Sequence, residues 1–438
     1  MKRIAIIGSG ISGLGAAFAL EGKAELTVYE ANDRPGGHAH TMDVDYDGTP
    51  ISVDVGFIVY NAHNYPNLIN FFKNLDVATK DSDMSFAVSN PKGFEWASTA
   101  RGMFAYRRNL LRPRFHKFWM TILRFNDLAR TELEADRIGD ISLGNWLDKH
   151  DFKPDFLDNY ILPMGGAIWS TPEAEMLNYP ALSFFRFFEN HRLMHRERPQ
   201  WRTVSDGSRA YVQKMAERLG DRLLLSTEVV TVEPFGDRVM VTTNDGQTAV
   251  YDDVILATHS DVSKKLLSES YEDKRFLLSS VRYRSNEIYL HRDPSLMPKR
   301  KTAWASWNVI KQDSPEICLT YWMNKLQNLP RHKPLFVTLN PVDPPKAELT
   351  FAHMQKSHPQ FDTAADAAVR ALKAQQGTQH IWLAGAWMGS GFHEDGLKAG
   401  LSCALSLGGQ VPWDSVGAER VSDIQTAPQN LQTTADVV

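Results

Sequence analysis

The chain contains few cysteines and no long hydrophobic run. Only Cys318 and Cys403 occur among its 438 residues, which excludes a disulfide framework and the ligand spacing of a cysteine-based metal site. We therefore predict no metal and a reducing, cytoplasmic location. No uncharged apolar stretch reaches the length of a membrane span, apart from the glycine-rich opening of the chain.

A strong charge of either sign is also missing. Lysine and arginine number 48 and aspartate and glutamate 52, which gives a formal net charge of −4 and argues against a general nucleic-acid binder. The hydrophobic content of 43% supports a large core, and the length allows two or three domains. Phenylalanine, tyrosine and tryptophan number 22, 13 and 11, a composition consistent with a sizeable apolar pocket.

The opening of the chain has the pattern of a dinucleotide-binding turn. Residues 3–7 form a short apolar strand pattern, and residues 11–21 form a helix pattern rich in Ala and Leu. Between them lies a G-x-G-x-x-G made by Gly8, Gly10 and Gly13. The first glycine permits the turn, the second lets the backbone approach a pyrophosphate, and the third lets the helix pack closely on the strand. The helix N-terminus, which includes Ser12, offers free N–H groups to the phosphates.

The second strand pattern ends in an acidic residue. Residues 25–29 lead to Glu30, and 30 − 8 = 22 residues separate this carboxylate from Gly8, where a dinucleotide fold places the acceptor for ribose hydroxyls. A secretory signal peptide is the alternative, because Lys2 and Arg3 precede an uncharged run to Leu20. Four glycines interrupt that run, so the dinucleotide interpretation is favoured.

The residues that follow resemble a known family. The segment Glu30-Ala-Asn-Asp-Arg34-Pro-Gly36-Gly37-His38 is similar to the extended FAD fingerprint of the amine oxidase and phytoene desaturase superfamily. In that fingerprint an arginine and a pair of glycines follow the strand that ends in Glu. The resemblance implies that FAD is contacted by Arg34, by Gly37 and at the position of His38, where relatives usually carry arginine. Neither cysteine stands where covalent attachment is found in amine oxidases, so FAD is expected to bind noncovalently.

Two later segments extend the resemblance. Asp54-Val-Gly56-Phe57 is similar to the Asp-x-Gly segment that runs beside the flavin in this superfamily, although Asp54 and Gly56 could also form an ordinary turn. Residues 381–400 predict a strand, a glycine-rich loop and a helix, similar to the carboxy-terminal flavin motif. The resemblance implies cofactor contacts at Gly385, Asp395, Gly396 and Leu397. A helix N-terminus beside the flavin ring stabilises negative charge on it. Ala386 stands where relatives usually carry an acidic residue, so one ribityl contact is missing.

The intervening chain predicts the rest of the fold. We expect a hairpin at residues 41–46 and 50–55, a capped helix at 64–75, and long helices within 84–204. Further strands are expected at 223–227, 228–232, 238–243, 253–258, 281–292, 302–309, 317–323 and 335–340. By the resemblance, the backbone at Val229 holds the adenine.

We therefore predict an α/β fold with a discontinuous Rossmann-like FAD-binding domain and a second α+β substrate domain that contains an antiparallel sheet plus helices. The FAD-binding domain comprises residues 1–83, 205–265 and 346–416, and the substrate domain residues 84–204 and 266–345. We expect residues 417–438 to form a disordered tail.

One segment of the predicted helical region is strongly basic. Seven arginines and lysines stand between Arg101 and Arg124 among bulky apolar residues, without one acidic residue, and residues 183–201 have a similar pattern. This mixture suits a helix that lies on an anionic membrane surface. The alternative is a solvated basic face over an ordinary core. The negative net charge and Pro113, which interrupts the helix pattern, favour this alternative. Peripheral contact with the inner membrane surface is thus one expectation.

The resemblance implies an FAD-dependent oxidoreductase but argues against an amine substrate. Amine oxidases of the superfamily carry a lysine near the flavin, and our alignment places Asn286 there. They also stack two aromatic rings before the flavin, where this chain offers Phe392 and His393. The form of the last motif, with residues 321–324 and 336–341, is similar to a bacterial subgroup associated with fatty-acid modification.

We therefore expect hydride transfer from or to a C–C bond of a lipid or fatty-acyl substrate. His393 and Glu394 are the predicted catalytic residues, because loss of a hydride must be matched by loss of a proton. Their alternative roles are loop structure and helix capping. A flavin-dependent double-bond isomerase, an amine oxidase and an FAD-binding protein without turnover remain as alternative functions.

Overall fold

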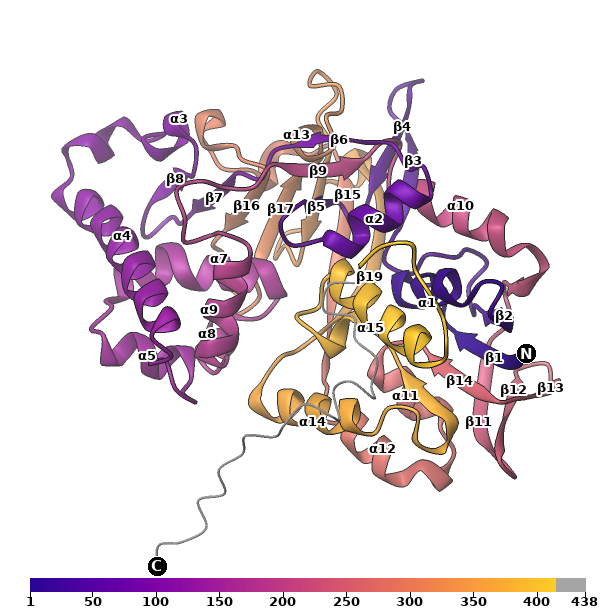
Figure 1. Cartoon of the computed structure of the whole chain (residues 1–438). Coiled ribbons are helices and arrows are strands. Elements are labelled where there is room, and N and C mark those ends of the chain that lie inside the picture. Colours follow the sequence, from indigo (N-terminus) through magenta and orange to yellow (C-terminus); the bar gives the residue numbers. More distant parts are fainter. Residues whose placement is uncertain (415–438) are drawn as a thin grey trace, which may run out of the picture.

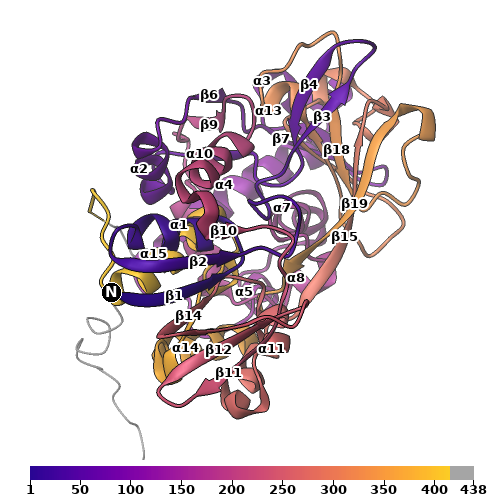
Figure 2. The same cartoon turned by 90° about the vertical axis from the view of Figure 1, so that its right-hand side faces the viewer.

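The computed structural model describes residues 1–414 of the chain. The predicted tail at 417–438 lies outside the described residues. The chain forms two parts, each organised around its own large sheet, and long strands run between the parts (Figures 1 and 2). A mixed α/β fold was predicted, and it is confirmed.

The first part is built on a five-stranded parallel sheet whose strands come from three distant stretches of chain. Their order is β10 (Leu223–Leu224), β2 (Ala24–Tyr29), β1 (Lys2–Ile7), β14 (Asp253–Leu256) and β20 (Ile381–Leu383). Parallel neighbours need crossover connections, and here these crossovers include whole segments of the second part. The Rossmann-like sheet is therefore discontinuous, as the sequence predicted.

Alternate residues of β1 point to opposite faces of this sheet. Ile4 and Ile6 pack beneath three helices, which are α1 (Ile11–Leu20), α10 (Arg209–Leu219) and α15 (His393–Ser406). Ala5 and Ile7 pack on the other face against a small antiparallel sheet and three helices. That layer consists of β11 (Val229–Phe235), β12 (Arg238–Thr243), β13 (Thr248–Tyr251), α11 (Ser260–Leu266), α12 (Glu272–Leu278) and α14 (Thr363–Ala374). The sheet is buried on both sides, as parallel sheets require.

The second part is built on a seven-stranded, mostly antiparallel sheet. Its order is β19 (Thr350–Pro359), β15 (Tyr283–His291), β18 (Phe336–Leu339), β17 (Cys318–Trp322), β16 (Trp307–Ile310), β7 (Phe86–Ser89) and β8 (Glu95–Ala97). The range 346–416 was assigned to the FAD-binding domain. However, β19 pairs with β15 along its whole length, so residues 350–359 belong to the sheet of the second part. The strand predicted at 302–309 is shorter, because residues Lys301–Ala303 form a 3-10 turn before β16.

Helices cover the sheet's outer end, on the left of Figure 1. They are α3 (Ala100–Met103), α4 (Pro113–Glu134), α5 (Leu143–Lys149), α6 (Pro154–Phe156), α7 (Leu162–Trp169), α8 (Glu173–Met176) and α9 (Ala181–Asn190). The short helix α13 (Met323–Leu326) lies apart from them, near the top centre of the view. Long helices were predicted within 84–204, and the structure has them, but the region begins with the strands β7 and β8. Parallel pairing of β7 with β16, more than 200 residues later, determines this. Among residues 1–414 no helix is both long enough and apolar enough to span a bilayer.

Smaller elements connect the two parts. The predicted hairpin is formed by β3 (Thr41–Asp45) and β4 (Pro50–Asp54), and its turn has φ values of 52° at Asp47 and 80° at Gly48. A three-stranded sheet joins β5 (Val59–Asn61), β9 (Trp201–Val204) and β6 (Thr79–Ser82). Between β5 and β6 lies α2 (Pro66–Asn74).

Candidate functional site

The first glycine turn follows β1 and leads into α1. Gly8 has a φ of 103°, and a Cβ atom there would lie 2.6 Å from the carbonyl oxygen of Ala257. A Cβ atom on Gly13 would overlap the carbonyl oxygen of Gly8, so the helix start can approach the strand only without a side chain. At Gly10 a Cβ atom would meet nothing within 4 Å. The turn is therefore tightly packed behind and open in front, where a diphosphate would need room beside the helix N-terminus.

A second glycine turn lies against the first. The Gly36 N–H donates to the carbonyl oxygen of Ser9 over 3.0 Å, and a Cβ atom on Gly37 would lie 3.3 Å from the Cα of Gly10. Arg34 spans this turn, because its Nη2 donates to the carbonyl oxygen of Gly37 over 3.1 Å. Burial lowers the pKa of the Arg34 guanidinium from its ordinary value, and the group stays charged at neutral pH.

Glu30 lies at the end of β2, beside both turns. Its carboxylate accepts four hydrogen bonds, from the N–H and the hydroxyl of Ser9 over 3.1 and 2.6 Å and from the N–H and the side-chain amide of Asn32 over 3.0 and 2.6 Å. A carboxylate has about four lone-pair positions, so a ribose hydroxyl would have to replace one of these donors. The carbonyl oxygen of Glu30 accepts from the Thr227 N–H over 2.9 Å, which brings the segment before Val229 alongside. The predicted adenine contact at Val229 thus lies near the predicted ribose acceptor.

The segment 54–57 runs next to His38. The Phe57 N–H donates to the carbonyl oxygen of His38 over 2.9 Å, and a Cβ atom on Gly56 would overlap that same oxygen. Asp54 points elsewhere, because its carboxylate accepts from the backbone N–H of Ser208 over 2.9 Å and from the Thr41 hydroxyl over 2.6 Å. Burial raises the pKa of Asp54 to about 6. The backbone of this segment therefore lies along the site, while the Asp54 side chain ties β4 to the start of α10.

The carboxy-terminal motif packs directly on the amino-terminal one. A Cβ atom on Gly396 would lie 2.8 Å from Ile11 and 3.0 Å from the Ser12 hydroxyl. One turn later, a Cβ atom on Gly400 would overlap the carbonyl oxygen of Ser12. Leu397 is fully buried and contacts Gly15. The N-terminus of α15 thus lies beside the N-terminus of α1, although nearly 400 residues separate them in the sequence.

The loop between β20 and α15 is held by Asp395. Its carboxylate accepts hydrogen bonds from the N–H groups of Ser390 and Phe392, each over 3.1 Å, and so caps the helix from within. Gly385 follows β20, and its position next to Trp387 leaves no room for a side chain. Burial raises the pKa of Asp395 above its ordinary value.

The two predicted catalytic residues both have structural partners. The His393 ring stacks on Phe57, with centroids 3.8 Å apart, and its Nε2 shares a 2.9 Å hydrogen bond with the Tyr211 hydroxyl. Burial lowers the pKa of His393 to about 3, so the ring is neutral. The Glu394 carboxylate accepts from the backbone N–H groups of Asn67 and Leu68 over 3.1 and 2.9 Å. Asn67 and Leu68 are the second and third residues of α2, so Glu394 caps the N-terminus of this helix. The sequence predicted a capped helix here but not that a distant residue supplies the cap. Proton transfer by either residue remains a prediction.

A group of histidines and a lysine was missed from the sequence. In the pairing of β15 with β19, Lys356 lies directly opposite Asn286. Lys356 and His358 point to the same face of β19, because side chains alternate along a strand. The ring of His38 lies 5.9 Å from that of His358 and 5.5 Å from that of His259. The Lys-x-His spacing is the only sequence signal for this group. It places both side chains on one face only if residues 350–359 form a strand, which was not predicted.

Charge is unbalanced in this His38–His259–Lys356–His358 group. Burial lowers the pKa of Lys356 to about 8 and that of His358 to about 4, so the lysine is mainly charged and the histidine neutral at pH 7. The titratable groups that affect His38 and Lys356 are Arg34, other members of the group and His393, whereas the carboxylate of Asp261 acts on His259 alone within the group. Lys356 makes no ion pair or side-chain hydrogen bond within residues 1–414.

Aromatic rings form a wall beside this group. The His358 Nδ1 and the Ser170 hydroxyl lie 3.0 Å apart, and the residue before Ser170 is Trp169. The Trp169 ring lies 4.8 Å from that of Phe187, which in turn stacks 5.0 Å from Phe392 at the start of α15. Tyr179 and Phe184 complete the wall at 4.7 and 5.6 Å from Trp169. A series of neighbouring residues therefore links His358 to Phe392 at the N-terminus of α15 through buried aromatic rings.

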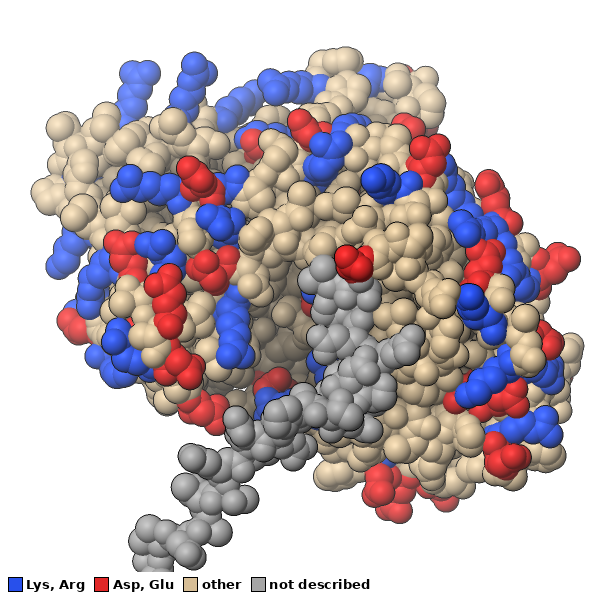
Figure 3. Space-filling model, in the orientation of Figure 1, with Lys and Arg blue, Asp and Glu red and all other residues tan. Residues whose placement is uncertain are grey.

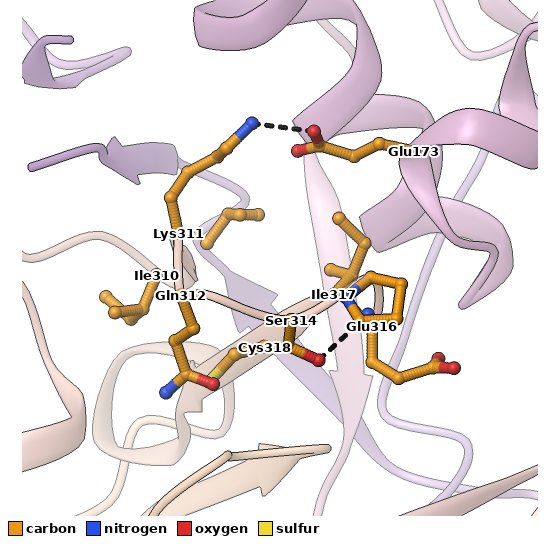
Figure 4. A pocket seen from close by; sticks show the side chains of 10 residues that line it. Glu173, Ile310, Lys311, Gln312, Ser314, Glu316, Ile317 and Cys318 are labelled. Atoms are coloured by element: carbon orange, nitrogen blue, oxygen red, sulfur yellow. Dashed lines mark hydrogen bonds and ion pairs between the residues drawn. The ribbon is translucent and has the colours of Figure 1, made fainter. Parts of the chain in front are cut away.

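Two hollows lie elsewhere around the described residues, one of them behind the carboxy-terminal motif. A cavity of about 200 Å³ behind the residue 387–390 loop is lined by α14 and the start of α9, with Lys373 and Asp366 at its walls. A second hollow, of about 30 Å³, lies at the turn between β16 and β17. There Lys311 Nζ and Glu173 form an ion pair, 2.6 Å long, that is drawn in Figure 4. That pair ties α8 to the sheet. Within residues 1–414, no three histidine, cysteine, aspartate or glutamate side chains are grouped so as to hold a metal ion.

Comparison with known proteins is consistent with this geometry. The model of the family described as flavin containing amine oxidoreductase matches residues 11–327. Cyclohexylamine oxidase from Brevibacterium oxydans IH-35A has a similar structure, with a TM-score of 0.68 and 16% identity over 93% of this chain and 98% of that chain. Wild-type putrescine oxidase bound to putrescine gives a TM-score of 0.67 at 16% identity over the same shares of the two chains. A CLA-producing fatty acid isomerase from P. acnes gives 0.61 at 14% identity, over 91% of this chain and 97% of that chain.

Proposed function

Because the chain belongs to the flavin-containing amine oxidoreductase family, it is an FAD-dependent oxidoreductase, and we propose that it acts on a C–C bond of an acyl chain or a similar apolar substrate. The family was predicted from the fingerprint around Glu30 and the loop before α15, and it is confirmed. Noncovalent binding of FAD is typical of such proteins, and both cysteines of this chain are buried.

The residues present fit FAD. Open space in front of Gly10 beside the α1 N-terminus would receive the diphosphate, and Glu30 would accept from the ribose in place of one of its donors from Ser9 or Asn32. The backbone of residues 55–57 and the N-terminus of α15 would flank the flavin ring, where the α15 dipole stabilises negative charge. FAD, when bound, supplies a two-electron acceptor or donor. The chain's own task is to orient the substrate, exclude water and take up or release the accompanying proton.

The observation that carries the substrate proposal is the unbalanced charge at Lys356. A protonated amine would be repelled by the Lys356 ammonium, because no carboxylate is among the groups that act on this lysine. An acyl chain with a terminal carboxylate suits both features, since the lysine would pair with the carboxylate and the aromatic wall would contact the chain. Asn286 stands where the resemblance places the amine oxidase lysine. Its side-chain oxygen accepts from the Asn340 Nδ2 over 2.7 Å, which leaves it as a buried structural amide.

The test is anaerobic absorbance spectroscopy of the purified, FAD-loaded protein. We expect extracted membrane lipids or long-chain fatty acids to bleach the flavin band, and mass analysis to reveal a product that is two hydrogens lighter. Cyclic and linear amines serve as the matched alternative substrates. Bleaching by amines with peroxide release in air would overturn the proposal in favour of amine oxidation.

Two further outcomes identify the remaining alternatives. A product of unchanged mass with a shifted double bond, formed without an electron acceptor, would indicate an isomerase. The structural likeness to the P. acnes isomerase is the reason to include this measurement. A yellow protein that responds to neither lipids nor amines would indicate FAD binding without turnover and would also overturn the proposal.

A further inference from the structure

Exposed large apolar side chains gather in two short segments of the chain. Of the twelve found in residues 1–414, four lie between positions 110 and 123, four lie between positions 224 and 235, and the other four are single. Only the first of these segments contains lysine or arginine. Leu111 is 88% exposed and Met120 66%, while Leu110 and Leu123 are about half exposed. Single exposed apolar residues are ordinary, but a cluster indicates a surface that binds something.

The packing of α4 shows that these residues are not needed for the core. Phe115, Phe118, Ile122 and Phe125 recur at helical spacing and are buried against the aromatic core around Trp96 and Trp146. At 100° per residue, Met120 and Leu123 lie on the opposite side of the helix from this stripe. The side of α4 that faces away from the core therefore exposes Met120 and Leu123 among polar and basic residues.

The turn before α4 extends the uncovered face. Residues Arg107–Leu111 form a 3-10 turn, and the His116 Nε2–H donates a 2.8 Å hydrogen bond to the carbonyl oxygen of Leu110. His116 is one helical turn before Met120, so this bond holds the turn on the flank that Met120 and Leu123 occupy. Leu111 therefore continues the apolar stripe beyond the start of the helix. The stripe ends at Asp127, which pairs with Arg130.

Unpaired positive charges border this stripe. Arg107, Arg108 and Lys117 are exposed and form no ion pair within residues 1–414. Arg114 is paired with Asp155, and Arg124 donates to the His150 carbonyl oxygen, so these two are engaged. Figure 3 shows blue side chains over tan surface at the upper left of the molecule, the part of the view where Figure 1 places α3 and the start of α4.

We propose that this basic apolar face, consisting of Arg107, Arg108, Leu111, Lys117, Met120 and Leu123, docks on the surface of an anionic phospholipid bilayer. Basic residues attract anionic headgroups, and apolar side chains enter the boundary between headgroups and acyl chains. The helix would lie parallel to the bilayer without crossing it. A second copy of the chain would bring like charges together, and nucleic acid would leave Leu111 and Met120 without an apolar contact. The proposal does not depend on the nature of the substrate.

Vesicle sedimentation of the FAD-loaded full chain tests this. We expect binding to vesicles of phosphatidylglycerol and phosphatidylcholine, weakened by raised salt, and little binding to pure phosphatidylcholine. Replacing Arg107, Arg108 and Lys117 together by Gln should weaken partitioning about a hundred-fold, since each basic residue near an anionic surface contributes roughly a factor of five. Leu111→Ser combined with Met120→Ser should abolish the binding that survives at high salt.

The matched controls lie on α11 and α12, at the opposite side of the molecule in Figure 1. Lys265→Gln removes an exposed cation, and Phe276→Ser removes a 72% exposed apolar ring. Neither should change vesicle binding. The proposal is overturned if wild type ignores anionic vesicles, or if the control variants lose binding as strongly as the face variants. Concentration-dependent dimerisation that the face variants abolish would assign the face to a second copy instead. Unchanged FAD content and melting temperature show that each variant is folded.

Discussion

The ring of Phe57 lies flat against the imidazole of His393, with centroids 3.8 Å and planes 8° apart. Phe57 follows the Asp54-Val-Gly56 segment, and His393 is the first residue of α15. The stack therefore joins two of the three segments expected to surround the flavin. The third, the first glycine turn, contacts α15 through Ser12 and Gly396. Three motifs spread over the chain are thus fixed relative to one another by packing within the protein.

The stack predicts how acid affects stability. Burial lowers the pKa of His393 to about 3, whereas an unfolded histidine titrates near 6.5. The folded protein binds fewer protons than the unfolded chain between these values. His393 therefore contributes its full stability above pH 6.5, and this contribution falls by about 1.4 kcal/mol per unit as the pH drops toward 3. We expect His393→Phe, which keeps a ring on Phe57, to reduce the slope of the unfolding free energy against pH by about 1.4 kcal/mol per unit, the slope that one proton contributes.

Denaturant unfolding between pH 4 and 7 measures that slope. His332→Phe is the control, because His332 is exposed and its replacement should leave the slope unchanged. If the unfolding free energy of His393→Phe depends on pH as in wild type, His393 is not held neutral in the folded protein and the prediction is wrong.

Glu394 offers a test between capping and catalysis. Its carboxylate binds the N–H groups of Asn67 and Leu68 at the start of α2, and burial raises its pKa above the ordinary value. A cap of this kind contributes about 1 kcal/mol. We expect Glu394→Ala to lose about that amount and Glu394→Gln less, because its amide oxygen can still accept. The rate of flavin reduction should stay within about three-fold in Glu394→Gln.

The opposite outcome would be informative. A hundred-fold loss of the reduction rate in Glu394→Gln at unchanged stability would show that the carboxylate also takes a proton from the substrate.

Gly10 and Gly13 belong to one motif but should respond differently to alanine. A Cβ atom on Gly13 would overlap the carbonyl oxygen of Gly8, whereas at Gly10 it would meet no protein atom within 4 Å. We expect Gly13→Ala to lower the melting temperature of the FAD-free protein by several degrees. Gly10→Ala should leave that temperature unchanged, yet weaken FAD binding at least ten-fold, because its methyl group would occupy the space needed by the diphosphate. Differential scanning fluorimetry and FAD titration measure the two effects. Equal FAD affinity in Gly10→Ala and wild type would show that the diphosphate does not bind at this turn.

Local features of the fold could be predicted from the sequence because they depend on neighbouring residues. Gly8 has a positive φ that few other residues adopt, and Asp47-Gly48 forms the tight turn that its composition indicates. The alternation of residues 283–291 likewise depends only on the strand itself. The order of the motifs then predicted that both ends of the chain meet around one nucleotide, and the contact of Gly396 with Ser12 agrees with this.

Features that depend on distant partners could not be predicted. The cap of α2 comes from Glu394, 327 residues later than Asn67. The strand β7 is short and apolar and obtains its partner from β16, so its own residues did not distinguish it from a helix. The position of Lys356 in the candidate site follows only from the strand register that places it opposite Asn286. No local pattern in the sequence contains this pairing.

Lys356 gives the sharpest test of the acyl-substrate proposal. Burial lowers its pKa to about 8, so the ammonium is present below that pH and is lost as the pH rises through it. A substrate carboxylate paired with this ammonium should therefore bind more weakly above pH 8. We expect KM for a free fatty acid to rise across this range in wild type. Lys356→Met should raise KM about ten-fold or more at pH 7, as expected for loss of a charge-assisted hydrogen bond, and should show no change near pH 8.

Two controls separate this charge effect from a change of fold. The methyl ester of the same acid lacks the carboxylate, so its KM should be similar in wild type and Lys356→Met. Lys299→Met removes an exposed lysine and should behave as wild type with both substrates. Lys356→Arg keeps the charge but cannot lose it below pH 12, so it should bind the acid at pH 7 and remain insensitive to pH near 8. If Lys356→Met retains both the wild-type KM and the change near pH 8, the carboxylate does not pair with this lysine and another group must hold it.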